Sequence, residues 1–299
     1  MSLPTVKLVS GRSVPRLSFG IGTQHYQSDA SSQVSKALSA GFTFLDAAEV
    51  YSNTKSMGKA VSEHLSSGVA SRKDLFLLTK LGSRGIPDPL GETKKELSDI
   101  GVSDKLDAVL LHYPPRGKDG APSNIEAWNR LEKVKDAGLV DVIGVSNWTA
   151  KDIEELLASK PKHKIEINQV ELNPFLYSHP DIQALLKLQE REGITTMSYG
   201  SLTSQYKDLK PDSKFQQTLE GVASKHGVSP GTALLYWNLQ RTNGIVVTTS
   251  GKEERMKQYV EDIKNIKTLS EEDLRSIEDA AAAEGAKGKK YYMTPFWEP

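Results

Sequence analysis

Side chains able to do acid–base chemistry follow one another at the ends of successive apolar runs. Asp46 closes one run, Lys80 the next and His112 a third, while Tyr51 lies a few residues after the first. A tyrosine hydroxyl titrates near about 10, so it is a weak acid at neutral pH unless a cation stabilises its phenolate. Lys80 could be that cation, with Asp46 as its counterion. A neutral His112 could direct a carbonyl oxygen by hydrogen bonding. The set suits protonation of an oxygen that gains negative charge.

Each of these residues also has an ordinary structural interpretation. Lys80 and Asp46 could form a plain ion pair, His112 could be a buried strand-end histidine, and Tyr51 could cap the core from a loop. Their convergence favours function, because further polar residues end the later runs: Ser146 and Asn147, Gln169, and Tyr199.

The elements that must position these residues are short apolar runs of the kind that form buried parallel strands. The predicted strands are Phe42–Asp46, Leu75–Lys80, Ala108–His112, Val142–Ser146, Ile165–Val170, Ile194–Tyr199 and Ile245–Val247, with Gly20–Thr23 ending an eighth. Segments with helical spacing lie between them, and alternation of strand and helix requires a parallel sheet. About eight units favour an α/β fold of the (β/α)8 TIM barrel type, in which strand ends share one catalytic face.

The two ends of the chain depart from this alternation. Thr5 to Leu17 predicts an N-terminal β-hairpin that plugs the bottom of the barrel. A C-terminal extra helix over Ser270–Ala283 leads into an aromatic tail that includes Tyr291 and Trp297. Thr149 and Asp152 resemble a capping box. Because no linker interrupts the pattern, we expect a single domain over residues 1–299.

Composition narrows the range of partners. The 299 residues carry a formal net charge of zero, which argues against a nucleic-acid surface and favours a small-molecule substrate. The absence of cysteine excludes disulfides and thiol chemistry. We see no leader and no run of about 20 apolar residues, so we expect a cytoplasmic protein with no membrane segment. We also expect a monomer.

Three motifs, found in order, resemble the aldo-keto reductase family over nearly the whole chain. Leu45 to Tyr51 with Met57 to Ala60 is similar to the family's Asp and Tyr signature, and Lys80 stands in a Leu-Thr-Lys context. Leu110 to Pro114 is similar to its histidine motif, and Ile143 to Trp148 to its central motif.

The resemblance implies roles for individual residues. Asp46, Tyr51, Lys80 and His112 would be the catalytic tetrad of a carbonyl reductase that uses NADPH. Ser146, Asn147 and Gln169 would hold the nicotinamide carboxamide, and Tyr199 would stack on its ring. The remaining expected site residues are Gly22, Thr23, Leu202, Ser204, Thr249, Ser250 and Arg255 for the cofactor, and Gln24 and Tyr113 for the substrate. No metal is implied.

Some positions differ from the common family pattern. Val247-Thr248-Thr249-Ser250 replaces the usual Ile-Pro-Lys-Ser, so a lysine is missing, and Gln24 stands where many members have tryptophan. Together with Asp-Ala-Ala-Glu, this resembles the fungal branch that reduces α-keto amides and conjugated polyketones. Arg255 still favours NADPH, because a guanidinium matches the oxygens of a 2′-phosphate.

Other functions remain possible for the same fold. A glycosidase would need two carboxylates from among Asp46, Glu49 and Glu171, but would leave Lys80 unexplained. A metal-dependent hydrolase would need close histidine ligands, whereas the six histidines are scattered. A nicotinamide-binding regulatory or redox-sensing barrel with little turnover is the alternative closest to the reductase.

Overall fold

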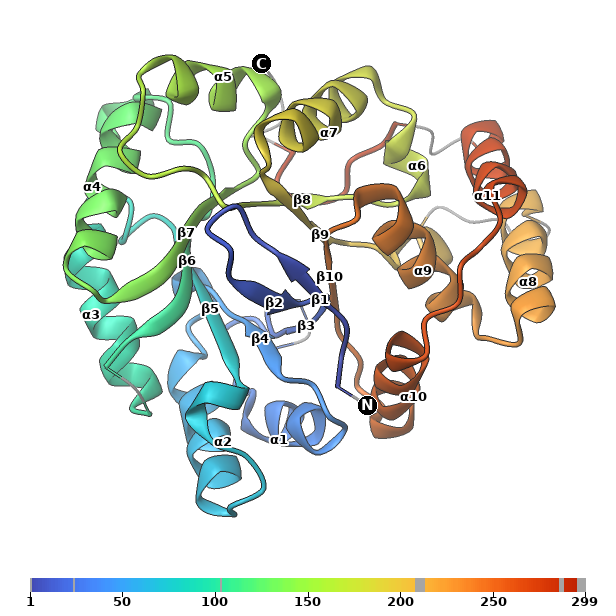
Figure 1. Ribbon diagram of the computed structural model, residues 1–299, viewed down its shortest axis with the longest axis horizontal. Coiled ribbons are helices and arrows are strands. Elements are labelled where there is room, and N and C mark those ends of the chain that lie inside the picture. The colour runs from blue at the N-terminus through green and yellow to red at the C-terminus, as the bar shows by residue number, and fades with distance from the viewer. Residues whose placement is uncertain (1, 24, 103, 208–212, 285–287, 295–299) are drawn as a thin grey trace.

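The computed structural model describes residues 2–23, 25–102, 104–207, 213–284 and 288–294, which form a closed barrel of parallel strands surrounded by helices (Figure 1). The eight barrel strands among these residues follow the order β10-β3-β4-β5-β6-β7-β8-β9. They run β3 Leu17–Gly20, β4 Phe44–Asp46, β5 Phe76–Leu81, β6 Leu106–Leu111, β7 Val140–Ser146, β8 Ile167–Glu171, β9 Thr195–Tyr199 and β10 Ile245–Thr248. This is the (β/α)8 TIM barrel that the sequence predicts.

Helices follow the strands around the outside of the barrel (Figure 1). They are α1 Ser31–Ser39, α2 Thr54–Ser66, α3 Pro89–Ile100, α4 Asn124–Asp136, α5 Ala150–Ala158, α6 Pro174–Tyr177, α7 Pro180–Glu192, α8 Lys214–His226, α9 Pro230–Thr242, α10 Glu253–Lys264 and α11 Glu271–Ala283. Single 3-10 turns are η1 Glu49–Tyr51, η2 Arg72–Asp74, η3 Lys118–Gly120 and η4 Thr203–Gln205. The helix predicted over 270–283 is α11, with Ser270 as its N-cap, and the predicted capping box of Thr149 and Asp152 opens α5.

Two apolar cores result from the alternation of side chains along each strand. One lies inside the barrel and contains Phe44, Phe76 and Met197, and the other lies between the strands and the helices and includes Trp128 and Trp237. Both cores hold the strands rigidly, so side chains at the strand ends have fixed positions.

The N-terminal hairpin closes the bottom of the barrel, where strands begin. Its strands are β1 Thr5–Lys7 and β2 Ser13–Pro15, paired antiparallel, and Leu8 and Val14 join the inner core. The hairpin predicted over residues 5–17 ends at Pro15, and Leu17 opens barrel strand β3. The hairpin crosses the centre of the view in Figure 1.

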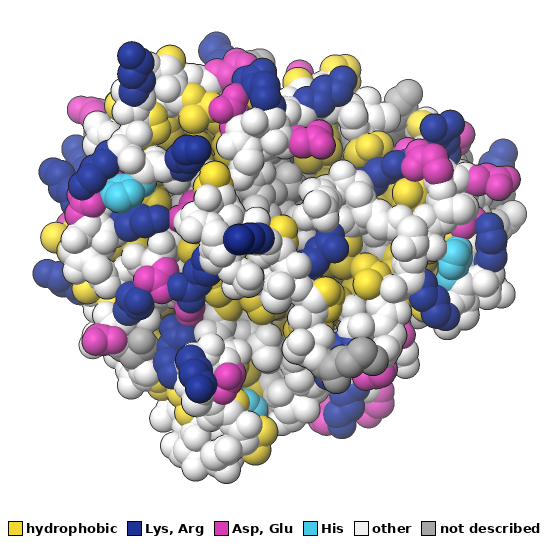
Figure 2. All heavy atoms as spheres, viewed as in Figure 1, with side chains coloured by type: hydrophobic (Ala, Val, Ile, Leu, Met, Phe, Trp, Pro, Cys, Tyr) yellow, Lys and Arg dark blue, Asp and Glu magenta, His cyan; other side chains and the backbone are white. Residues whose placement is uncertain are grey.

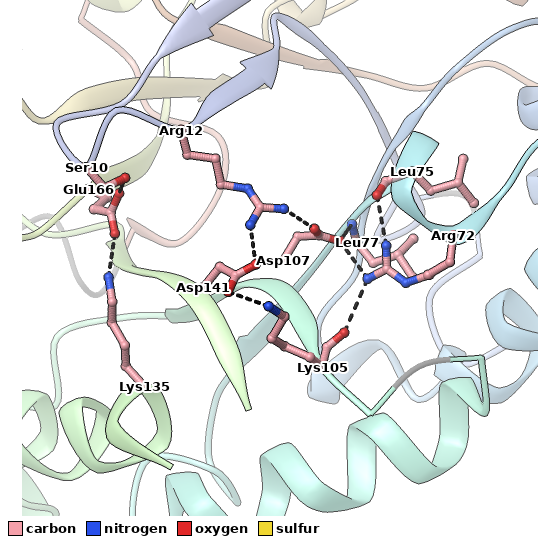
Figure 3. Close-up of polar contacts among 10 residues, drawn as sticks. All are labelled: Ser10, Arg12, Arg72, Leu75, Leu77, Lys105, Asp107, Lys135, Asp141 and Glu166. Atoms are coloured by element: carbon pink, nitrogen blue, oxygen red, sulfur yellow. Dashed lines mark hydrogen bonds and ion pairs between the residues drawn. The ribbon is translucent and has the colours of Figure 1, made fainter. Parts of the chain in front are cut away.

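Charged residues fasten the hairpin to the strand starts (Figure 3). Arg12 bridges Asp107 and Asp141, the carboxylate of Asp107 also accepts from Arg72 at 2.6 Å, and Lys105 pairs with Asp141 at 2.8 Å. Over the face shown in Figure 2, positive and negative side chains are interspersed, in keeping with the balanced composition. No described helix is both long and apolar enough to cross a membrane.

Strand boundaries differ from the predictions by one to three residues, the largest difference being at β3, which ends at Gly20 rather than Thr23. β4 begins at Phe44 rather than Phe42, β6 ends at Leu111, just before His112, and β8 reaches Glu171. A strand ends where its backbone stops pairing with its neighbours, and neither apolar nor polar character in the sequence marks that residue.

Candidate active site

The four residues expected to act as a tetrad meet at one end of the barrel. Asp46 ends β4, Lys80 lies near the end of β5, and His112 directly follows β6. Tyr51 ends the short turn η1 after β4. Since the barrel strands are parallel, these residues share the carboxyl-terminal face, where barrel enzymes carry their chemistry.

Lys80 is completely buried, and its ammonium is held by two groups. The Nζ atom donates to Asp46 Oδ1 and, at 2.8 Å, to the main-chain oxygen of Ala47. Burial lowers the pKa of Lys80, and the carboxylate of Asp46 opposes that lowering. Asp46 is therefore the counterion that a desolvated ammonium requires.

The phenol ring of Tyr51 lies close to both this ammonium and the ring of His112. Lys80 Nζ is 5.2 Å from the ring centre, and the His112 ring meets it edge-on with centroids 5.7 Å apart. Burial, and then the negative charge of Asp46, raise the pKa of Tyr51 well above its usual value. In the protein as described, the hydrogen bonds of Lys80 go to Asp46 and Ala47, and the pKa of Tyr51 is raised rather than lowered. Tyr51 is instead held as a protonated phenol.

His112 is a neutral imidazole. Burial, and then the charge of Lys80, lower the pKa of His112 to about 3. Its main-chain N–H donates to Leu81 O at 2.8 Å, and its Nδ1 has no hydrogen-bond partner among the described residues.

The residues expected to hold a carboxamide form a connected polar group beside this centre. Asn147, in the left-handed region at φ 61°, donates to His112 O at 2.9 Å and accepts from the Tyr199 hydroxyl at 2.7 Å. Asparagine tolerates this conformation better than most residues. Ser146 donates to Gln169 O at 2.8 Å, and all three predicted carboxamide ligands are buried. The structure therefore brings them together with Tyr199.

Buried hydroxyl groups collect where β9 and β10 end. The side-chain oxygens of Ser204, Thr248 and Thr249 lack hydrogen-bond partners within the described part of the chain. Buried polar groups seldom stay unpaired, so this cluster fits a ligand rich in acceptors, such as a dinucleotide phosphate. Thr248 was missed by the sequence reasoning, which singled out its neighbours.

The region expected to receive the 2′-phosphate lies at the start of α10. Arg255 is exposed there, in the first turn of the helix. The hydroxyl of Ser250 bonds to the backbone of Lys252 and shapes the turn before the helix. An arginine at a helix N-terminus fits an anion.

The remaining predicted residues border the centre. Gly22 packs directly on Tyr51, since a Cβ atom there would lie 2.4 Å from Tyr51 Cζ. Thr23 is exposed and Leu202 is half-buried. Gln24, expected to contact substrate, lies outside the described residues.

Aromatic side chains border the catalytic group. Tyr113 stacks against His112 with ring centres 6.2 Å apart. Tyr26, half exposed, meets Tyr51 edge-on at 6.1 Å and was missed by the sequence reasoning, since nothing in its local pattern marks it. Together they form flat apolar walls.

The three carboxylates that a glycosidase could use are each engaged elsewhere. Asp46 holds Lys80, Glu49 accepts the backbone N–H groups of Arg84 and Gly85, and Glu171 contacts the C-terminal tail. Because protein groups already occupy each carboxylate, none of the three is free to serve as the acid or the nucleophile of glycoside hydrolysis.

Comparisons with known proteins agree with this geometry. The chain matches the model of the Aldo/keto reductase family over residues 17–282. Aldehyde reductase YPR1 of Saccharomyces cerevisiae is 30% identical over 313 residues, covering 96% of this chain and 93% of that protein. The NAD/NADP-dependent indole-3-acetaldehyde reductase of Schizosaccharomyces pombe is 32% identical over 260 residues, covering 83% and 86%.

Solved structures show the same barrel. An aldo-keto reductase from Bombyx mori in complex with NADP superposes with a TM-score of 0.81 at 26% identity, covering 94% of this chain and 93% of that chain. An aldo/keto reductase from Brucella melitensis gives 0.76 at 30% identity, covering 93% and 100%. The chain belongs to the aldo/keto reductase family and is an oxidoreductase.

Proposed function

We propose that this protein is an NADPH-dependent carbonyl reductase in which Tyr51 protonates the carbonyl oxygen. The observation that carries the proposal is the placement of a protonated phenol beside both a buried ammonium and a neutral imidazole. A reduced nicotinamide, when bound, would supply the hydride for the carbonyl carbon. The hydroxyl of Tyr51 supplies the proton to the carbonyl oxygen, and hydride and proton together convert the carbonyl to an alcohol.

The other residues orient and stabilise this transfer. His112 donates from Nε2 to the carbonyl oxygen, because its neutral ring carries one N–H and its Nδ1 has no acceptor among the described residues. Lys80 lies over the Tyr51 ring, where its charge stabilises the phenolate as the proton leaves. Asp46 keeps Lys80 in place. Ser146, Asn147 and Gln169 would hold the carboxamide.

NADPH is the proposed cofactor because the guanidinium of Arg255 can form charged hydrogen bonds to the 2′-phosphate. Replacing Arg255 with Ala should weaken NADPH binding by about 1.5–3 kcal/mol, the worth of a charged hydrogen bond, and leave NADH almost unchanged. Titrations followed by nicotinamide fluorescence would give the dissociation constants of NADPH and of NADH. Lys257→Ala, an exposed cation in the same helix, is the control. Equal weakening of NADPH and NADH binding would show that Arg255 has a structural role and does not bind the 2′-phosphate.

The proposed substrates are reactive dicarbonyls such as α-keto amides, α-keto lactones or isatin-like rings. Support comes from the resemblance to the fungal branch, from Gln24 in place of tryptophan, and from the flat walls of Tyr26 and Tyr113. Flat conjugated carbonyls stack on such walls. We infer that the enzyme acts as a cytoplasmic monomer.

A substrate screen tests this assignment. Consumption of NADPH, followed by its absorbance, should be most efficient with dicarbonyls and weaker with simple sugars and steroids. Equal or better efficiency with sugars or steroids would contradict the dicarbonyl assignment. Stoichiometric cofactor binding without turnover on any carbonyl would favour the regulatory alternative.

A further inference from the structure

A buried ion pair joins the barrel mouth to the C-terminal tail, residues 288–294. Glu171, at the end of β8, is fully buried, and the side chain of Lys290 is only 6% exposed. Their charged atoms, Oε2 and Nζ, are 3.7 Å apart. Burial raises the pKa of Glu171 and lowers the pKa of Lys290, and each charge opposes the shift of the other.

The carboxylate of Glu171 also binds the backbone of the tail. It accepts the N–H of Tyr291 at 3.2 Å and that of Tyr292 at 3.0 Å. The tail is further anchored where Gly288 donates to Phe175 O at 2.7 Å. One buried carboxylate therefore gathers an ammonium and two amides from the same short segment.

Gly200 leaves the space that this contact needs. It follows β9 with φ 67°, in the left-handed region that favours glycine. A Cβ atom at this position would lie 3.1 Å from Glu171 Cγ and 3.5 Å from Tyr292 Cε2. The chain thus has a glycine at a position that borders both Glu171 and the tail.

The docked tail bears directly on Tyr199. The ring of Tyr292 meets that of Tyr199 at 6.1 Å and 63°, and Lys290 Nζ lies 6.0 Å from the Tyr199 ring centre. On its other side, the Tyr199 hydroxyl donates to Asn147. The orientation of Tyr199 is therefore fixed by the tail and by the predicted carboxamide group together.

We propose that Glu171 and Lys290 are positioning residues that dock the tail on Tyr199 and so hold this ring ready to stack on the nicotinamide. The inference rests on the proposed function only in taking Tyr199 as the stacking residue. Breaking one partner of a buried charge pair leaves the other uncompensated, so either loss should release the tail. A released tail leaves Tyr199 supported from one side alone.

The test compares Lys290→Met and Glu171→Gln with the control Lys289→Met, an identical change at the adjacent, exposed tail position. Hydrogen exchange of the amides in 288–294 should accelerate in both pair variants and stay unchanged in the control. Release of NADPH, followed by stopped-flow nicotinamide fluorescence, should be roughly tenfold faster or more, as expected when a buried charge pair is broken. Lys290→Arg, which keeps the charge, should restore most of the slow release.

The outcomes separate this inference from the proposed function. Unchanged tail exchange in both variants would overturn the docking role, and faster tail exchange with unchanged NADPH release would overturn the positioning of Tyr199. The protein could bind NADPH and yet reduce no carbonyl. Faster release of NADPH from the two pair variants would then support this inference although the proposed function is wrong. A wild-type protein that binds no nicotinamide would overturn both.

Discussion

Acidification should destabilise the folded protein through His112, which the barrel mouth holds as a neutral imidazole. Its pKa falls from 6.5 to about 3 on folding. Below pH 6.5, His112 therefore takes up a proton in the unfolded chain but not in the folded protein. The stability that depends on a neutral His112 is complete above pH 6.5 and is lost as the pH falls toward 3. At about pH 5 the loss amounts to about 2 kcal/mol.

The measurement is urea unfolding of the wild type and His112→Gln at about pH 8 and about pH 5. Glutamine cannot take up the proton, and every other titrating group is shared by the two proteins. The wild type should therefore lose about 2 kcal/mol more than the variant between the two pH values. An equal loss in both would show that His112 titrates in the fold as it does in water, and the argument for a neutral hydrogen-bond donor would be wrong.

Two further substitutions test the packing of the site and of the hairpin. Gly22→Ala should displace the Tyr51 ring and lower kcat by about 100-fold, the scale of a misplacement near 1 Å, while Gly221→Ala, with open space around it, should leave kcat unchanged. A normal kcat in Gly22→Ala would show that Tyr51 is not held against this backbone. Arg12→Met should lower the free energy of unfolding by about 1–2 kcal/mol by removing two charged hydrogen bonds, one of them to Asp107, from a partly exposed site. Unchanged urea unfolding would mean that the charged contacts of Arg12 add nothing to the stability of the docked hairpin.

The barrel could be predicted from the sequence because its signals are local. Runs such as Val142–Ser146 are apolar on both faces, and each is followed by a helical period, which leaves few arrangements other than a closed parallel sheet. The convergence of Asp46, Lys80 and His112 then follows from topology, because parallel strands end on one face.

Contacts between distant segments could not be predicted in the same way. Glu171 accepts from Tyr291, 120 positions further along the chain, and no periodicity links them. The pKa of Tyr51 depends on how deeply the ring is buried and on how close the carboxylate of Asp46 lies, and both are properties of packing. Tyr26 reaches Tyr51 from a loop whose path the sequence does not determine.

The central claim is that Tyr51 donates the proton, and Tyr51→Phe tests it most directly. The variant should bind NADPH with the wild-type dissociation constant, measured by fluorescence, while single-turnover reduction of a dicarbonyl slows by about 10²–10⁴-fold, the range of general acid catalysis. Tyr236→Phe, which removes one hydroxyl from α9 outside the barrel, should reduce the substrate at the wild-type rate. Reduction by Tyr51→Phe at a rate close to the wild type would contradict the account and assign the proton to another group, with His112 the nearest candidate.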